Sequence, residues 1–429
     1  MNESLGISLN HSFCVDLSDW EWKIHYLFRW WLEGVGILLV GTIGVVFNVI
    51  AISVLQTKEM VVIRFNNLVV CLAIADTIFL LTSIFYHIGH AFGFQIELSY
   101  LHQSMFTSLV YPWRAISMCF STYITIALAF DRYHAVTNPS RYRASLRSAT
   151  HPLVKVLHCT LPILCLSILF NVSRFFDLCI KEHLDGEVGN STSQTTIQSY
   201  HIAETPLRKN EKYVFWYVNV ANFLVTGLVP LALLVYLNGQ LIFKRNTFIQ
   251  RQKKRKKSSF HGIEYQNQRL ATFKNHRQQT IILHTIVILF LLCHALRIVL
   301  NINEWMIVED YIKAKELGCP SRRFWSSLAT PVSHLLLQIN SGANFFIYSV
   351  LNETFTKVLK EKIVNVLVCF KLLTQRPTKT SEQAVVFRCI NTQSKSPHGV
   401  RLKTCEIVES TSAHLDRTNG EFIPSEQPV

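Results

Sequence analysis

Seven apolar stretches, each long enough to cross a lipid bilayer, constrain the fold of this chain more than any other feature. A helix needs about 20 mainly apolar residues to cross a membrane. Of the 429 residues, 49% are hydrophobic and only 16% are charged, whereas soluble domains average about 25% charged residues. The chain is therefore predicted to be an all-α membrane protein, a seven-transmembrane helix bundle. The predicted spans are about 32–56, 65–89, 105–130, 153–176, 213–242, 279–305 and 325–350.

The distribution of basic residues predicts an extracellular N-terminus. In that orientation the inner loops, about 57–64, 135–152 and 244–277, carry sixteen Lys and Arg residues. The outer loops, about 90–104, 177–212 and 307–324, carry eight. Basic residues favour the cytoplasmic side of a membrane, so the chain is expected to be a multi-pass protein of the plasma membrane with its N-terminus outside.

Glycosylation sequons give independent support for this orientation. Sequons of the form Asn-X-Ser/Thr occur at Asn2, Asn10 and Asn190, all in segments that the orientation places outside. These three asparagines are the predicted glycosylation sites.

The net charge of +14 is concentrated in one loop, around the stretch KRNTFIQRQKKRKK. Two spans bracket this loop, so its expected neighbour is the anionic inner leaflet of the lipid bilayer, and no nucleic acid is expected as a partner. The run has two interpretations, a solvated loop that sets the topology and a contact for a cytoplasmic partner.

Five polar residues from four spans are predicted to meet near the middle of the membrane. Counted from the cytoplasmic ends at 1.5 Å per residue, Asp76 and Ser121 each lie about 16 Å deep. A carboxylate at that depth is costly and points to function. We expect a shared polar cluster, with water or Na⁺ at Asp76; separate helix–helix hydrogen bonds are the alternative. The five members are Asn48, Asp76, Ser121, Asn340 and Asn344.

Three motifs, in order and at matching depths, resemble those of rhodopsin-like (class A) G-protein-coupled receptors. They are NNLVVCLAIAD in the second span, DRYHAVTNP after the third and NSGANFFIYSVLNETF in the seventh. Within that class, FNVSRFF, TPLRKNEKY, LCHALRIVLN and NFFIY are similar to segments of the invertebrate FMRFamide-type neuropeptide receptors.

The resemblance implies a set of residues for activation and coupling to a heterotrimeric G protein. Arg132 would turn toward the G protein and would be held at rest by Asp131, with Tyr133 completing the triplet. Tyr348 would stabilise the active arrangement, and Asn238 stands where a tyrosine is common. A guanidinium that pairs locally or reaches into an opened cavity has two discrete states.

The chain departs from that class in its cysteines. The usual disulfide joins the outer end of the third helix to the second outer loop, but no cysteine lies between Cys71 and Cys119. The candidates on the oxidising side are Cys14, Cys179 and Cys319, and Cys14–Cys319 is the preferred pair.

Two arginines at matched depth suggest the chemistry of the ligand. Arg114 and Arg297 lie about 27 and 30 Å above the inner ends of their spans. Guanidinium groups suit carbonyls, a terminal amide or a carboxylate; pairing with lipid headgroups or loop acids is the alternative. Glu304 is expected to face the cavity and to bind a basic ligand residue, or else to be solvated. His334 lines the pocket or is an interior histidine, and Arg174 is expected to snorkel.

The C-terminal part is expected to serve signalling. Residues 353–370 place apolar side chains on one helical face and lysines on the other, which predicts a short amphipathic eighth helix on the inner leaflet. Cys369 is a candidate for palmitoylation. Residues beyond it are rich in Ser and Thr, which arrestin and receptor kinases would use. The predicted parts are 1–30, an extracellular segment; 31–351, the transmembrane domain; 352–370, the surface helix; and 371–429, a disordered tail.

The sequence thus favours a receptor for an extracellular neuropeptide, with an amidated FMRFamide-like peptide as one candidate ligand. The alternative is a seven-span ion or proton transporter or channel that uses Asp76. No nucleophile–base pair, CxxC motif or zinc-binding pattern is found, so neither catalysis nor a metal site is expected. Apart from Na⁺ at Asp76, no cofactor is expected.

Overall fold

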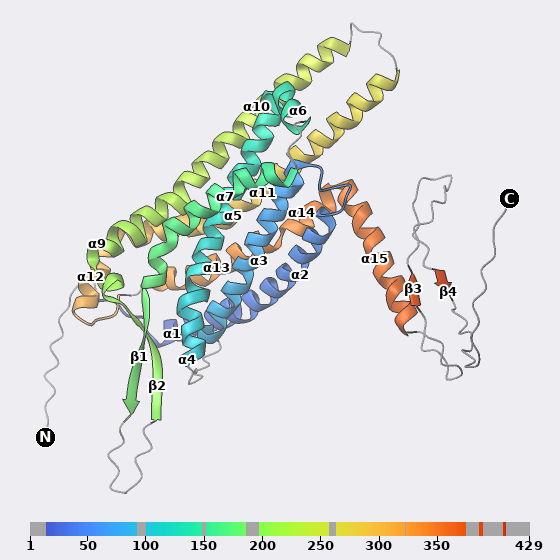
Figure 1. Cartoon of the computed structure of the whole chain (residues 1–429). Helices are drawn as coiled ribbons and strands as arrows, with labels where there is room; N and C mark the ends of the chain where they lie inside the picture. The colour runs from blue at the N-terminus through green and yellow to red at the C-terminus, as the bar shows by residue number, and fades with distance from the viewer. Residues whose placement is uncertain are drawn as a thin grey trace, which may run out of the picture. The chain divides into compact units, whose positions relative to one another are not determined.

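The first of the chain's two compact units is a bundle of long helices with one β-hairpin (Figure 1). The units cover residues 1–362 and 363–429. The structure, a computed structural model, describes residues 14–91, 100–147, 152–185, 197–256, 263–321, 323–374, 386–388 and 406–408.

The first helix begins within the predicted N-terminal segment. It runs without a break through α1 (Asp19–Phe28), η1 (Arg29–Gly36) and α2 (Ile37–Leu55). A capping box explains this start: the backbone N–H and hydroxyl of Ser18 donate hydrogen bonds of 2.8 and 2.7 Å to Glu21. The helix therefore extends well before residue 32, where apolar composition alone predicted the start of the span.

The remaining helices follow the predicted order. They are α3 (Arg64–Ala91), α4 (Tyr100–Met105), η2 (Phe106–Val110), α5 (Tyr111–Thr137), α6 (Pro139–Arg147), α7 (Pro152–Asn171), η3 (Val172–Phe176), α8 (Pro206–Lys209), α9 (Glu211–Tyr213), η4 (Val214–Ala221), η5 (Phe223–Leu228), α10 (Val229–Lys256), α11 (Ile263–Met306), α12 (Val308–Glu316), α13 (Phe324–Gly342), α14 (Asn344–Leu351) and α15 (Glu353–Thr374).

Within the described residues, six helical stretches are long and apolar enough to cross a membrane. They match the first six predicted spans. The seventh is built from α13 and α14, which Ala343 separates, and its Ser, Gln and Asn residues make it more polar than the others. The six are Asp19–Leu55, Arg64–Gly89, Gln103–Thr137, Val154–Phe176, Glu211–Lys244 and Arg277–Met306.

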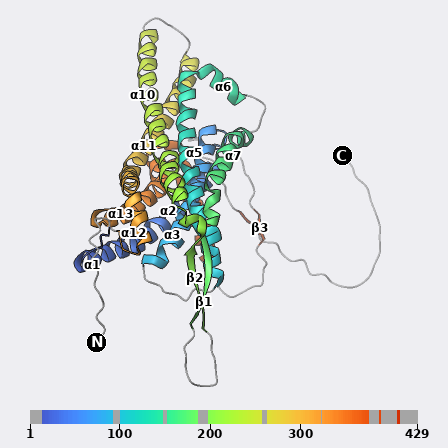
Figure 2. The same ribbon diagram turned by 90° about the vertical axis from the view of Figure 1, so that its left-hand side faces the viewer.

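Helices α3 and α5 lie at the centre of the bundle. Helix α3 packs against α2, α5, α7 and α13, and α5 also packs against α10. The end that carries the Cys14–Cys319 disulfide is called the disulfide end here, and the opposite end, where α5 finishes beyond Arg132, is called the Arg132 end. Helices α10 and α11 run beyond their neighbours at the Arg132 end (Figures 1 and 2).

A two-stranded antiparallel hairpin projects from the disulfide end (Figure 2). It pairs β1 (Leu178–Asp185) with β2 (Ile197–Glu204), with Leu178 opposite Glu204 and Asp185 opposite Ile197. The hairpin follows the fourth span, in the loop that the sequence places outside.

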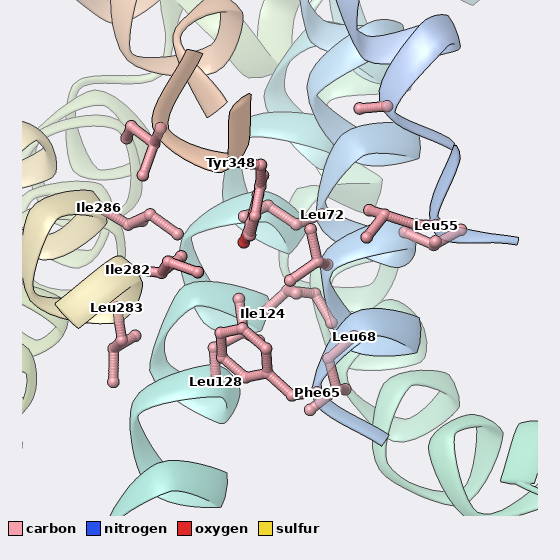
Figure 3. Packing of buried hydrophobic residues seen from close by; sticks show 14 of the residues in the cluster. Leu55, Phe65, Leu68, Leu72, Ile124, Leu128, Ile282, Leu283, Ile286 and Tyr348 are labelled. Atoms are coloured by element: carbon pink, nitrogen blue, oxygen red, sulfur yellow. The ribbon is translucent and has the colours of Figure 1, made fainter. Parts of the chain in front are cut away.

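The apolar core lies in the half of the bundle nearer the Arg132 end. Figure 3 shows Leu68 and Leu72 from α3, Ile124 and Leu128 from α5, and Ile282 and Ile286 from α11 around Tyr348 of α14. Removing a large apolar side chain from water contributes about 1.5–3 kcal/mol. In a bilayer the side chains that face lipid are removed from water as well, so this core holds the helices together chiefly through van der Waals packing. This core joins the three helices that carry the polar groups described below.

Two glycines let α2 and α13 approach closely. A Cβ atom on Gly44 would lie 3.0 Å from the Cα of Gly342 and 2.8 Å from Leu80 Cδ1. A side chain at this point would therefore force the first and seventh helices apart, as at other small-residue helix contacts in membranes.

A helix is present where the amphipathic eighth helix was predicted. At the start of α15, Phe355 and Val358 are buried in the core, whereas Ile363 and Val366 farther along are exposed. Its location on a membrane surface stays a prediction. The second unit also contains the antiparallel pair β3 (Val386–Arg388) and β4 (Glu406–Val408), and most of the predicted tail lies outside the described residues.

Candidate functional site

A buried polar cluster surrounds Asp76 where α3, α5 and α14 meet. The hydroxyl of Ser121 donates a 2.7 Å hydrogen bond to Asp76 Oδ1, and Asn344 Nδ2 donates one of 2.7 Å to Oδ2. Asp76 is only 1% exposed. Each carboxylate oxygen therefore has a donor from a different helix, which offsets part of the cost of burial and couples three helices through one group.

The other two predicted members lie beside this cluster. Asn48 Nδ2 donates a 3.2 Å hydrogen bond to the backbone carbonyl of Ser341, so it reaches the cluster through the backbone of α13. Asn340 is half-buried and lines a small cavity together with Ser121 and Ser341. The structure therefore brings the five residues together in one region, with Ser121 and Asn344 in direct contact with Asp76.

A second polar group closes the Arg132 end. Arg132 Nε donates a 3.1 Å hydrogen bond to Asp131, and a terminal nitrogen bonds the same carboxylate and, at 2.6 Å, the hydroxyl of Tyr142 in α6. The other terminal nitrogen bonds Gln279 of α11. Arg64 Nε lies 3.4 Å from the second oxygen of Asp131. Arg132 is thus held both by its own helix and by α11.

The aromatic neighbours of Arg132 complete this group. Its guanidinium carbon lies 4.6 Å from the ring centre of Phe65, within the range of a cation–π interaction. Burial raises the pKa of Tyr142 to about 12, so the phenol stays neutral at physiological pH and donates to Asp131 over 3.2 Å. Asp131, Arg132 and Tyr142 therefore form a triad in which each side chain is hydrogen-bonded to the other two.

The remaining residues expected to act in activation are Tyr348, Asn238 and Tyr133. Tyr348 is 1% exposed, and its hydroxyl has no hydrogen-bond partner among the described residues. The side chain of Asn238 donates a hydrogen bond of 2.9 Å to the carbonyl of Leu234 within its own helix, and Tyr133 packs against the apolar core. A buried hydroxyl without a partner is unusual, so Tyr348 has bonding capacity that another arrangement of the bundle can use.

At the disulfide end, Arg114 is enclosed by partners from α3. Its Nε donates 3.1 Å to Ser83 Oγ, and a terminal nitrogen lies 3.4 Å from His87 Nε2. The guanidinium carbon is 4.7 Å from the ring centre of Tyr86. Arg297 of α11 is half-buried and close enough to Arg114 for electrostatic interaction. Two like charges that interact in one region favour an anionic or carbonyl-rich group near both of them.

An acidic residue, Glu33, lies in the same region. Its Oε1 is 2.7 Å from Nδ1 of His334, and its Oε2 is 3.2 Å from Nε of Arg29. The Nδ1 atom of His87 lies 3.7 Å from Oε1. Arg114, His87, Glu33 and His334 thus form a continuous chain of polar contacts across the third, second, first and seventh helices.

Comparison with known protein families decides the class of the chain. Residues 37–365 match the family model described as "Serpentine type 7TM GPCR chemoreceptor Srw". The chain belongs to this family of G-protein-coupled receptors. The receptor is therefore a multi-pass membrane protein of a family that is not enzymatic, and the match offers no support for the transporter alternative.

Two curated relatives narrow the resemblance. The receptor is 27% identical over 341 residues to the "FMRFamide receptor" of Drosophila melanogaster, which covers 77% of this chain and 53% of the relative. It is 20% identical over 363 residues to the "Probable G-protein coupled receptor frpr-1" of Caenorhabditis elegans, covering 81% and 83%. The match thus spans about half the length of the Drosophila relative. Among G-protein-coupled receptors, the receptor resembles FMRFamide receptors.

The disulfide of the receptor joins the predicted pair. Cys14 is bonded to Cys319, with the two Cα atoms 5.6 Å apart and a sequence separation of 305. Val15 and Ser321 form a β-bridge beside it. The segment before the first helix is therefore attached to the segment before the seventh, while Cys179 remains a free thiol.

The structure bears on two expectations about charged residues at the disulfide end of the receptor. Glu304 is exposed at the end of α11, in keeping with the solvated alternative, whereas Asn301 and Asn303 are the buried residues there. Arg174 does not snorkel. It lies 3.3 Å from the buried carboxylate of Asp177 and 3.0 Å from the hydroxyl of Tyr111, because a fully buried acid on the adjoining loop attracts it inward.

Some predicted sites of the receptor cannot be located. Asn2, Asn10 and Asn190 lie outside the described residues, and so does the side chain of Cys369, although its backbone belongs to α15. Glycosylation and palmitoylation of these residues stay predictions.

Sequence reasoning missed several residues of the receptor's polar groups. Of these, Glu33 was the easiest to predict from the sequence, because an acid inside an apolar helix carries the same signal that singled out Asp76. Tyr142 and Gln279 are ordinary polar residues near span ends, and only the packing of α6 and α11 against α5 brings them to Arg132. Ser341 contributes its backbone carbonyl, which no residue pattern reports.

Proposed function

We propose that the protein is a plasma-membrane receptor for an extracellular amidated neuropeptide, of the FMRFamide-like class, and that it signals to a heterotrimeric G protein. The observation that carries the proposal is the similarity to the receptor named for FMRFamide, which extends over 341 residues and so includes most of the bundle. In this proposal the N-terminus and the disulfide end face outward, and the basic loop between α10 and α11 faces the cytoplasm.

The charges at the disulfide end support a peptide ligand with exposed carbonyl groups. Arg114 and Arg297 are two cations in one partly buried region, and a guanidinium group recognises carbonyl and carboxylate oxygens through several donors. A ligand with a C-terminal amide supplies a carbonyl oxygen without adding a negative charge. Glu304 and His334 remain candidates for further contacts, Glu304 from the exposed rim and His334 from within.

The Arg132 end supports coupling to a G protein. Arg132 is bound to Asp131 within α5 and to Gln279 on α11, so a movement of α11 away from α5 would break one contact and keep the other. Such an arrangement has two discrete states, as a receptor switch requires. Na⁺ at Asp76, and regulation of the tail by receptor kinases and arrestin, belong to the same proposal.

A panel of peptides tests the function. Cells that express the full chain are exposed to amidated peptides, including FMRFamide, and to the same peptides as free acids, and G-protein dissociation is recorded by energy transfer. We expect a saturable response to one amidated peptide and a weaker response to its free acid. Untransfected cells and an Arg132→Ala variant at equal surface level are the controls. A ligand-gated current without G-protein dissociation would support the transporter or channel instead.

A further inference from the structure

Three side chains from three helices converge near the disulfide end of the bundle. Glu33 lies on η1, His87 on α3 and His334 on α13. Each offers one ligand atom, and the three atoms lie within 4.8 Å of one another. Glu33 and His87 are 6% and 3% exposed, and the two imidazole rings are 4.7 Å apart. Two imidazoles and one carboxylate therefore share a small, mostly buried volume.

This donor set has the composition of a transition-metal site. Two imidazole nitrogens and one carboxylate oxygen are the ligands of many zinc sites that leave a fourth position open. Ligand atoms at about 2.0–2.1 Å around a tetrahedral ion lie about 3.4 Å from one another. Oε1 of Glu33 is 2.7 Å from Nδ1 of His334 and 3.7 Å from Nδ1 of His87. Small side-chain rotations would therefore bring these atoms to the required separations.

We propose that Glu33, His87 and His334 form a binding site for a divalent transition-metal ion, of which Zn²⁺ is the representative. The carboxylate and the two neutral imidazoles would occupy three positions, and water or a ligand group would fill the fourth. Hard cations such as Mg²⁺ and Ca²⁺ prefer oxygen ligands and are excluded by this donor set. The site would connect the first, second and seventh helices.

Neighbouring arginines affect metal binding at this site in two opposite ways. Arg29 binds the other oxygen of Glu33, at 3.2 Å, and so leaves Oε1 for the metal while fixing the orientation of the carboxylate. Arg114, Arg297 and Arg29 are cations near His334 and weaken the affinity of the site for an ion that adds further positive charge.

The neighbouring arginine links the metal to the peptide site proposed above. If the metal takes Nδ1 of His87, the remaining proton of that ring stands on Nε2, which lies 3.4 Å from a terminal nitrogen of Arg114. Two donors then face each other, so Arg114 must turn away from His87. Zn²⁺ would thereby change the position of an arginine that the proposed function assigns to the ligand, a consequence that rests on that function, whereas the metal site itself does not.

Direct metal binding tests the proposal without any peptide. The purified full-length receptor in nanodiscs is stripped with a chelator, and Zn²⁺ is titrated in competition with a fluorescent zinc indicator. We expect one saturable Zn²⁺ per receptor that excess Mg²⁺ does not displace. The variants Glu33→Gln, His87→Gln and His334→Gln should each bind at least tenfold more weakly, whereas His158→Gln and His201→Gln, at exposed positions, should bind like the wild type.

Two outcomes would overturn the site. They are the absence of saturable binding by the wild type, and binding that persists in all three variants, which would leave the cluster a set of hydrogen bonds around Glu33. A further variant separates loss of ligand from loss of fold. His334→Cys replaces the imidazole with a thiolate, a softer ligand, so it should retain Zn²⁺ and bind Cd²⁺ more tightly than the wild type does. Failure of this variant to gain Cd²⁺ affinity, although it is folded by its melting temperature, also counts against the site.

Discussion

The hydroxyl of Tyr111 donates a 2.9 Å hydrogen bond to Asp177, a carboxylate with no exposed surface, and thereby ties the start of α5 to the loop that follows α7. The hydroxyl of Tyr213 donates a hydrogen bond of 2.7 Å to the other oxygen of Asp177, and Arg174 forms a salt bridge with the same carboxylate. In receptors of the class it resembles, a disulfide makes this connection, but here no cysteine is available at the top of the third helix. A buried polar network joins the same two segments.

We therefore predict that Tyr111→Phe lowers the melting temperature of the detergent-solubilised receptor. The change removes one donor from a buried carboxylate, which should cost about 1–3 kcal/mol. Tyr236→Phe, at an exposed position on α10, is the matched control. If both variants melt at the same temperature, the contact between Tyr111 and Asp177 contributes nothing to stability.

The Cys14–Cys319 disulfide gives a second prediction. Because one bond needs both thiols, Cys14→Ser, Cys319→Ser and the double variant should lose the same fraction of surface expression and stability. Loss of a disulfide that closes a long loop typically costs about 2–5 kcal/mol. Cys179→Ser, which removes a free thiol in the hairpin, should have a smaller effect. Additive losses in the double variant would show that the two cysteines act separately.

The polar cluster around Asp76 gives a third prediction. Asp76→Asn should reduce the agonist response and its sensitivity to Na⁺ more than it reduces surface expression, because the carboxylate couples α5 and α14. Asn344→Ala should resemble it, since Asn344 donates directly to Asp76. Asn340→Ala, which alters only the cavity beside the cluster, should have a smaller effect. Dose–response curves with and without Na⁺, at matched surface level, make the comparison; an unchanged response and Na⁺ sensitivity in Asp76→Asn would refute the coupling.

Depth counting explains why this cluster was predictable from sequence. A helix advances a fixed distance per residue, so polar residues at equal depth in apolar spans identify a common level. Equal depth does not determine which side chains touch. Asn340 and Asn344 lie one turn apart on the seventh span, yet only Asn344 bonds Asp76, because the helix is interrupted at Ala343 between them.

Depth along a helix does not predict contacts between residues that are distant in sequence. Glu33 and His334 are 301 residues apart, and their pairing depends on how the first and seventh helices are rotated. Apolar spans that face lipid on one side and helices on the other carry little periodicity to define that rotation. Glu304 illustrates the result: its level on α11 was predictable, but depth alone left a cavity-facing and a solvated position open, and the structure shows it exposed.

The contact between Arg132 and Gln279 gives a fourth prediction. Gln279→Ala removes the only described hydrogen bond from Arg132 to α11, so it should raise basal G-protein activity several-fold. Gln279→Glu places a carboxylate at the same point and should lower basal activity, because a guanidinium binds a carboxylate more strongly than it binds a neutral amide oxygen. Basal G-protein dissociation without agonist, normalised to surface level, is the measurement. The same basal activity in both variants would mean that this bond does not hold α11 at rest.

The last prediction concerns the two arginines at the disulfide end. A bound peptide would offer carbonyl or amide oxygens to Arg114 and Arg297, so agonist potency should fall roughly 10- to 100-fold, about 1.4–2.8 kcal/mol, in either alanine variant. The two variants should differ in stability, however. Arg114 already bonds Ser83 and packs on Tyr86, so its removal also leaves buried groups without a partner, whereas Arg297 is half-buried.

Lysine variants separate recognition from packing. Arg297→Lys keeps the charge but loses the planar fork of donors, so it should recover only part of the potency if the ligand is bound by two oxygens at once. Full recovery would indicate that charge alone matters. Exchanging an exposed arginine or lysine elsewhere, such as Lys313→Ala on α12, should leave potency unchanged. Unchanged potency in both Arg114→Ala and Arg297→Ala at matched surface level would place the peptide elsewhere on the receptor and leave these arginines a structural role.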